Sequence, residues 1–207
     1  MDELIEQLAR LKKGVVVLGS RPGMGLTSTS LVLANKLADK TETLFVSYQH
    51  PNEELLDLLS FNGQTHNHSL MLDDSIDYYK SLYVQLVNRL NVRSDISVIF
   101  IDDLDTFLGE AKIDGREKKD VVSTFAKLAI DYSVIVVLNT VVSRNVELRG
   151  GDKRPRIRDF NWSRNLVGLA NQVFVLYRPG YYGITESEDG ECTLARSEIY
   201  NLKGLIE

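Results

Sequence analysis

The stretch that decides the fold is Val15-Val16-Val17-Leu18-Gly19-Ser20-Arg21-Pro22-Gly23-Met24-Gly25-Leu26-Thr27-Ser28. It begins as an apolar run rich in β-branched residues, passes through a turn with two glycines, and leads into a helical segment that carries Leu31, Leu33 and Leu37. In this arrangement of strand, turn and helix, backbone N–H groups and a helix N-terminus bind phosphate. We therefore predict a nucleotide-binding loop formed by Ser20, Arg21, Pro22, Gly23, Met24, Gly25, Leu26, Thr27 and Ser28.

A second element supports a nucleotide site, because the apolar run Val98–Ile101 ends in Asp102 and Asp103. In phosphate-loop ATPases such an aspartate holds Mg²⁺ together with a loop hydroxyl, so we predict Thr27 and Asp102 as metal ligands and ATP or ADP with Mg²⁺ as the cofactor. The usual motif has a lysine where this chain has Leu26. That replacement predicts weakened nucleotide binding, and a glycine turn without any ligand remains the alternative.

The rest of the chain alternates short apolar runs with segments of helical periodicity, which is typical of βαβ units. The predicted strands are Val15–Gly19, Thr43–Ser47, Ser97–Ile101, Val134–Leu138 and Gln172–Tyr177. We expect an α/β fold with a largely parallel central sheet flanked by helices, and a C-terminal hairpin or strand formed by the residues after Tyr177. No linker divides the chain, so we predict one domain over residues 1–207.

The composition restricts the classes of function. A formal charge of −5 and a pI near 5.3 exclude a wholly basic nucleic-acid-binding surface, so any such contact requires a local patch. The single cysteine excludes an internal disulfide framework. No signal-peptide pattern and no apolar run near the ~20 residues of a membrane span is present. We expect a cytoplasmic protein without a membrane partner.

Four longer strings carry a family resemblance. They are SRPGMGLTS (20–28), VIFIDDLDTF (98–107), VSRNVELRGGDKRPRIRDF (142–160) and VFVLYRPGYYGI (173–184). In order and spacing, from about Lys12 to Lys203, the chain resembles the C-terminal ATPase domain of DnaB-type replicative DNA helicases. The resemblance implies a RecA-like P-loop fold that assembles into a hexameric ring, with ATP between subunits and single-stranded DNA in the channel.

The departures from the family pattern fall on the chemistry of hydrolysis. Leu26 replaces the loop lysine, Gln49 the glutamate that activates water, Val141 the γ-phosphate sensor and Leu205 the arginine finger. We therefore predict a degenerate homologue that is a pseudo-ATPase. The family's N-terminal domain and linker helix are not visible in the sequence, so we do not expect a stable self-assembled homo-hexamer.

One segment supplies the local basic patch. We predict contacts with single-stranded DNA from the residues Arg144, Arg149, Lys153, Arg154, Arg156 and Arg158. The alternative is a solvated loop with Arg154 and Asp159 in structural ion pairs. Tyr177, Tyr181 and Tyr182 could stack on a base, although packing is the simpler role for them.

Three functions are compatible with these residues. The first is an impaired DnaB-like domain that keeps nucleotide or DNA contacts and acts as an accessory or regulatory protein beside a helicase or another replication protein. The second is an active ATP-dependent DNA helicase, with the missing cations supplied by positions such as Lys203 or by a partner chain. The third is a non-catalytic interaction module that has kept only the fold.

Overall fold

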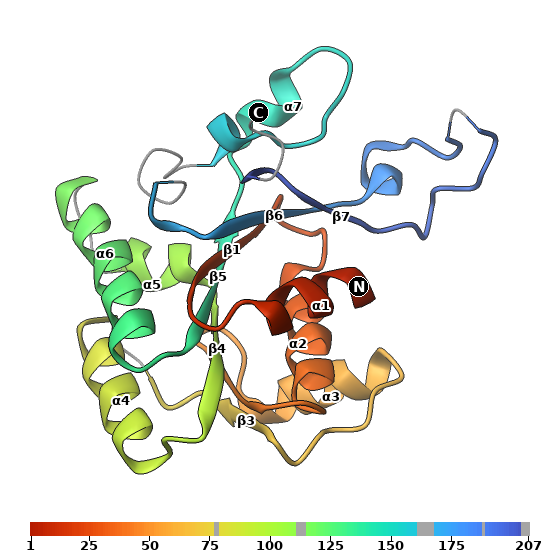
Figure 1. Ribbon diagram of the computed structural model, residues 1–207. Helices are drawn as coiled ribbons and strands as arrows, with labels where there is room; N and C mark the ends of the chain where they lie inside the picture. Colours follow the sequence, from red (N-terminus) through yellow and green to blue (C-terminus); the bar gives the residue numbers. More distant parts are fainter. Residues whose placement is uncertain (77–78, 111–114, 161–167, 188, 204–207) are drawn as a thin grey trace.

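A computed structural model of the chain describes residues 1–76, 79–110, 115–160, 168–187 and 189–203. Its centre is a seven-stranded sheet in the order β3-β2-β4-β5-β1-β6-β7 (Figure 1). The strands are β1 (Gly14–Ser20), β2 (Glu42–Ser47), β3 (Leu70–Asp73), β4 (Ile96–Asp102), β5 (Ile135–Val141), β6 (Gln172–Tyr177) and β7 (Glu198–Asn201). Every neighbouring pair is parallel except β6 and β7, which confirms the predicted largely parallel sheet.

Helices cover both faces of this sheet (Figure 1). They are α1 (Asp2–Arg10), α2 (Leu26–Leu37), α3 (Asn52–Phe61), α4 (Tyr79–Val92), α5 (Leu104–Glu110), α6 (Gly115–Asp131) and the short α7 (Asn145–Leu148). Among the described residues, two 3₁₀ turns follow later in the chain, η1 (Ile157–Asp159) and η2 (Pro179–Tyr182). Within the described residues no helix is long and apolar enough to cross a bilayer.

The core consists of two apolar layers, one on each face of the sheet. Helices α1, α2 and α3 pack on one face, where Leu31 and Phe45 are buried. Helices α4, α5 and α6 pack on the other, where Leu86 and Phe125 are buried. Because both faces are covered, the central strands are continuous apolar runs, which is why the sequence predicts them.

The edges of the sheet differ from its centre. Strand β7 pairs antiparallel with β6 and confirms the expected final strand after Tyr177. Strand β3 was not predicted, because Leu70–Asp73 is only four residues long and contains no β-branched residue. Helix α4 begins at Tyr79, and Ile76, three residues earlier in the chain, is buried.

Parallel register brings the carboxyl ends of the central strands to one edge of the sheet. Ser20 at the end of β1 pairs with Val141 of β5 and Leu176 of β6, and Ser47 of β2 pairs with Asp102 of β4. In open α/β sheets ligands bind at this edge. The loop that follows β1 therefore lies next to the ends of β4 and β5.

Candidate functional site

The phosphate loop joins β1 to α2 and lines a cleft of about 610 Å³. Gly23 and Gly25 have φ angles of 83° and 82°, in the left-handed region where a side chain is strained. Gly25 is also the N-cap of α2. The loop therefore presents backbone groups and a helix N-terminus to the cleft, as phosphate binding requires.

Some side chains of the loop are packed into the fold. The buried Arg21 guanidinium donates to the Glu147 carboxylate at 2.6 Å and to the Val142 carbonyl at 2.6 Å. Met24 is buried as well. Arg21 thus ties the loop to α7, and its charge is neutralised by Glu147.

At the base of the cleft, the Asp102 carboxylate is only 1% exposed. Its Oδ1 accepts a hydrogen bond from Asn139 Nδ2 at 2.7 Å, and the Thr27 hydroxyl is bonded to the same carboxylate. Burial raises the pKa of Asp102, while the bonds from Asn139 and Thr27 oppose that rise. The structure brings Thr27 and Asp102 together, as predicted for a shared metal.

Asn139 is a part of this site that the sequence reasoning missed. It lies in β5, is fully buried, and also donates to the Ser30 hydroxyl at 2.7 Å. Its Oδ1 has no hydrogen-bond partner in the described part of the chain, which is unusual for a buried amide. The sequence signal for it is an amide side chain that directly follows the apolar run Ile135–Leu138.

The cleft carries the neutral amide of Gln49 where the family pattern has a glutamate. Gln49 is exposed and donates from Nε2 to the Thr106 hydroxyl at 2.5 Å. His50 is bonded through Nδ1 to Glu54 at 3.1 Å. Burial raises the pKa of the neighbouring Asp103, whose Oδ1 accepts the Thr106 amide at 2.6 Å. Asp103 therefore serves to fix the start of α5.

The four degenerate positions are not all placed. Leu26, Gln49 and Val141 line the cleft together. Leu205 lies outside the described residues. The Lys203 ammonium, considered as a substitute cation, donates to the Ala170 carbonyl just before β6. It thus lies at the sheet edge opposite the phosphate loop of its own chain.

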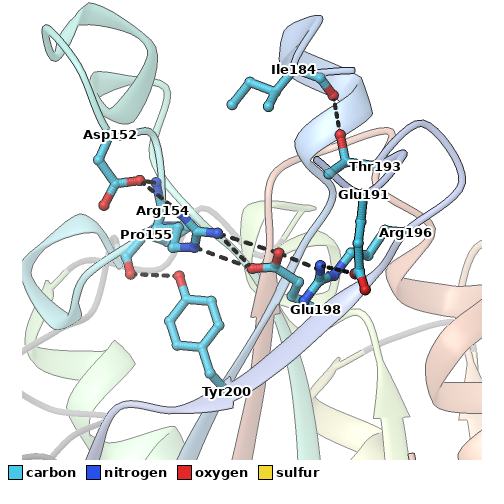
Figure 2. Close-up of polar contacts among 9 residues, drawn as sticks. All are labelled: Asp152, Arg154, Pro155, Ile184, Glu191, Thr193, Arg196, Glu198 and Tyr200. Carbon is cyan, nitrogen blue, oxygen red and sulfur yellow. Dashed lines mark hydrogen bonds and ion pairs between the residues drawn. The ribbon is translucent and has the colours of Figure 1, made fainter. Parts of the chain in front are cut away.

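In the basic segment, half of the predicted residues are bonded within the chain. Arg149 pairs with the buried Asp159 at 2.5 Å, and the Lys153 ammonium donates to the carbonyl of Glu147 at 3.0 Å. Figure 2 shows Arg154 paired with Glu198 of β7 at 3.0 Å. Arg154 and Asp159 are both in ion pairs, though not with each other.

The loop is also held by aromatic rings. The Arg154 guanidinium lies 5.0 Å from the centroid of the buried Tyr177 ring. The Tyr200 hydroxyl donates to the Pro155 carbonyl at 2.9 Å, a contact that Figure 2 draws. Tyr177 stacks on Tyr182, so both are packing residues. Tyr181 remains exposed.

The other half of the basic segment is open to solvent. Arg144, Arg156 and Arg158 are exposed and form no ion pair in the part of the chain that the structure describes. Arg144 precedes α7, Arg156 is the N-cap of η1, and Arg158 lies within η1. These three guanidinium groups are the ones that a phosphate backbone could contact without breaking the fold of the segment.

Comparison with known families agrees with this geometry. The family model of the DnaB-like helicase C terminal domain matches residues 57–201. The chain belongs to this family. The match begins after the phosphate loop and contains β4, β5, β6 and the basic segment, so the region of Leu26 and Gln49 lies before it.

Curated relatives and solved structures support the same DnaB-like assignment. The chain is 24% identical over 202 residues to the replicative DNA helicase DnaC of Bacillus subtilis (strain 168), which covers 83% of this chain and 44% of that protein. It is similar in structure to a solved ATPase domain, with a TM-score of 0.74, 18% identity, and coverage of 96% of this chain and 84% of that one. A DnaB-like replicative helicase, solved in a study of its interactions with primase, gives a TM-score of 0.71 at 19% identity and covers 92% of this chain and 54% of that one.

The solved structures confirm the RecA-like fold predicted from the sequence. The chain spans less than half the length of the Bacillus subtilis relative. The comparisons therefore establish the fold and the family.

Proposed function

We propose that this DnaB-like domain binds a magnesium nucleotide, is impaired in ATP hydrolysis, and acts in DNA replication as an accessory or regulatory protein. One observation carries the proposal. The cleft keeps the left-handed glycines and the Thr27 and Asp102 pair, yet Leu26 and Gln49 line the same cleft with an apolar chain and a neutral amide. The cleft thus keeps the groups that would bind a magnesium nucleotide and lacks two side chains that the family pattern uses for ATP hydrolysis.

The residues present fit a bound Mg²⁺. This ion prefers oxygen ligands and is held in phosphate-loop enzymes by a hydroxyl and a carboxylate. Thr27 and Asp102 supply these two groups within hydrogen-bonding distance of each other. When bound, the ion would neutralise phosphate charge, and Asn139 would keep the Asp102 carboxylate in place.

Hydrolysis requires more than this set. An attacking water must lose a proton, and Gln49 Nε2 donates a hydrogen bond without providing a basic group. A lysine at position 26 would stabilise negative charge in the transition state, and Leu26 cannot. Bound ATP is therefore held without efficient turnover.

Single-stranded DNA is the second proposed ligand. The exposed Arg144, Arg156 and Arg158 supply the charge, and the ion pairs of Arg149 and Arg154 fix the loop that carries it. The relatives are named as DNA helicases, and one of the solved structures concerns interactions with primase. A helicase or another replication protein is therefore the proposed partner.

Calorimetric titration with ATP, with and without Mg²⁺, tests the nucleotide site. We expect binding that strengthens when Mg²⁺ is present, and loss of that Mg²⁺ effect in Thr27→Val, because valine keeps the shape and removes the hydroxyl ligand. Thr65→Val, at an exposed loop position, is the matched control and should behave as the parent. No heat of binding in the parent would contradict the proposal and favour a pure interaction module.

A further inference from the structure

Arg178, the first residue after β6, carries a guanidinium that borders the phosphate loop. Its Nη1 atom lies 4.0 Å from the position that a Cβ would occupy on Gly25. The Tyr181 ring, from the same turn, lies 3.3 Å from the equivalent position on Gly23. The segment after β6 therefore lies against both left-handed glycines of the loop.

The backbone of Arg178 is fixed, whereas its side chain has no partner among the described residues. Its carbonyl accepts the Tyr181 amide at 3.1 Å in η2, and parallel pairing of Ser20 with Leu176 sets β6 beside β1. The guanidinium is half-buried and forms no hydrogen bond or ion pair with the described part of the chain. A partly buried, unpaired cation is unusual and marks a position where an anion would be stabilised.

The cleft lacks any other uncommitted cation among the described residues that line it. Arg21 is neutralised by Glu147, and His50 is bonded to Glu54. Asp102 and Asp103 add negative groups. The phosphates of a nucleotide would then meet carboxylates and the Leu26 side chain, without an uncommitted cation among the described lining residues.

We infer that Arg178 supplies to the bound phosphates the positive charge that a lysine at position 26 supplies in an intact loop. Oxygens bound by the N–H groups of the loop lie about 3 Å from those nitrogens, within reach of a guanidinium already beside Gly25. A planar guanidinium can contact two phosphate oxygens at once. This inference rests on the proposed nucleotide binding, and it explains how binding survives the loss of the lysine.

The test measures ATP and ADP affinity by calorimetry, with Mg²⁺, in four proteins: the parent, Arg178→Gln, Arg178→Lys and the surface control Arg10→Gln. We expect Arg178→Gln to weaken both nucleotides about tenfold to a hundredfold, because a charge-assisted contact is lost. Arg178→Lys should keep most of the affinity, since the charge remains. Arg10 lies on α1, 80% exposed in its side chain, so its replacement should change nothing.

Leu26→Lys, made in the parent and in Arg178→Gln, separates a phosphate role from a general loss of structure. If Arg178 stands in for the lysine, Leu26→Lys improves affinity more in Arg178→Gln than in the parent, because the two cations serve the same phosphates. Equal gains in both backgrounds, or parent-like affinity in Arg178→Gln, overturn the inference and leave the proposed function intact. A parent that binds no nucleotide refutes the proposed function itself, and the inference with it.

Discussion

At the scale of single residues, the carboxylate of Asp102 is the proposed Mg²⁺ ligand, and its burial lowers the stability of the fold when it is ionised. Its carboxylate is almost completely buried, and desolvation raises its pKa. A carboxyl group whose pKa is raised on folding favours the folded state below its unfolded pKa. That stability is lost as the pH rises through the folded pKa. The ionised form that Mg²⁺ requires is therefore the form that burial disfavours.

We expect Asp102→Asn to increase the free energy of unfolding without ligand and to abolish the Mg²⁺ dependence of nucleotide binding. The increase should be largest at alkaline pH, above the folded pKa of Asp102. It should shrink as the pH falls below that raised pKa, and it should vanish near the unfolded pKa of an aspartate. Urea unfolding over a pH series measures it, with the exposed Asp57→Asn on α3 as the control. A gain that grows toward acid pH would contradict this assignment of charge.

At the scale of elements, the basic segment divides into anchored and open residues. Arg149 and Arg154 hold the segment to Asp159 and to β7, whereas Arg156 and Arg158 are exposed on either side of Ile157. Sequence alone could not divide them, because the partner of Arg154, Glu198, is 44 residues away in the chain. The predicted patch is thus only partly available for phosphate.

Replacing the two exposed arginines, Arg156 and Arg158, tests the proposed contact with single-stranded DNA. Arg156→Ala/Arg158→Ala should weaken binding of single-stranded DNA and lower the slope of log affinity against log salt by about 1.4, at roughly 0.7 for each phosphate contact. Arg10→Ala/Lys13→Ala removes the same charge from exposed positions at the end of α1 and just after it, and should leave the slope unchanged. Fluorescence anisotropy at several salt concentrations gives both values. Equal slopes of log affinity against log salt in the two variants would contradict the DNA contact and favour a solvated loop for the basic segment.

Elements buried on both sides were the most predictable. Continuous apolar runs revealed the central strands, since a covered parallel sheet needs apolar residues on both faces. The edge strand β3 could not be predicted, because it forms by pairing with β2 and its residues have little strand propensity. In the site, the two glycines after the first apolar run predicted the loop, and the acid after the run Val98–Ile101 predicted the role of Asp102. Asn139 and Arg178 could not be placed, because their contacts depend on the register of β5 and β6.

At the scale of the whole molecule, a RecA-like sheet brings the residues of the proposed nucleotide site to one edge. In the same cleft, Leu26, Gln49 and Val141 depart from the family pattern. Such a domain would respond to nucleotide without consuming it. Its contribution to replication would come from what it binds, with the exposed arginines as the DNA contacts. Whether it hydrolyses ATP is therefore the central question.

The most direct measurement is ATP turnover in the presence of Mg²⁺ and single-stranded DNA, for the parent and for Leu26→Lys/Gln49→Glu. We predict that the parent binds ATP with no turnover above background, and that the double variant hydrolyses ATP measurably, because it regains a phosphate cation and a base. Replacement of Gln49 by methionine in the Leu26→Lys variant keeps the bulk without the base and should remain inactive. Robust DNA-stimulated turnover by the parent chain would contradict the account.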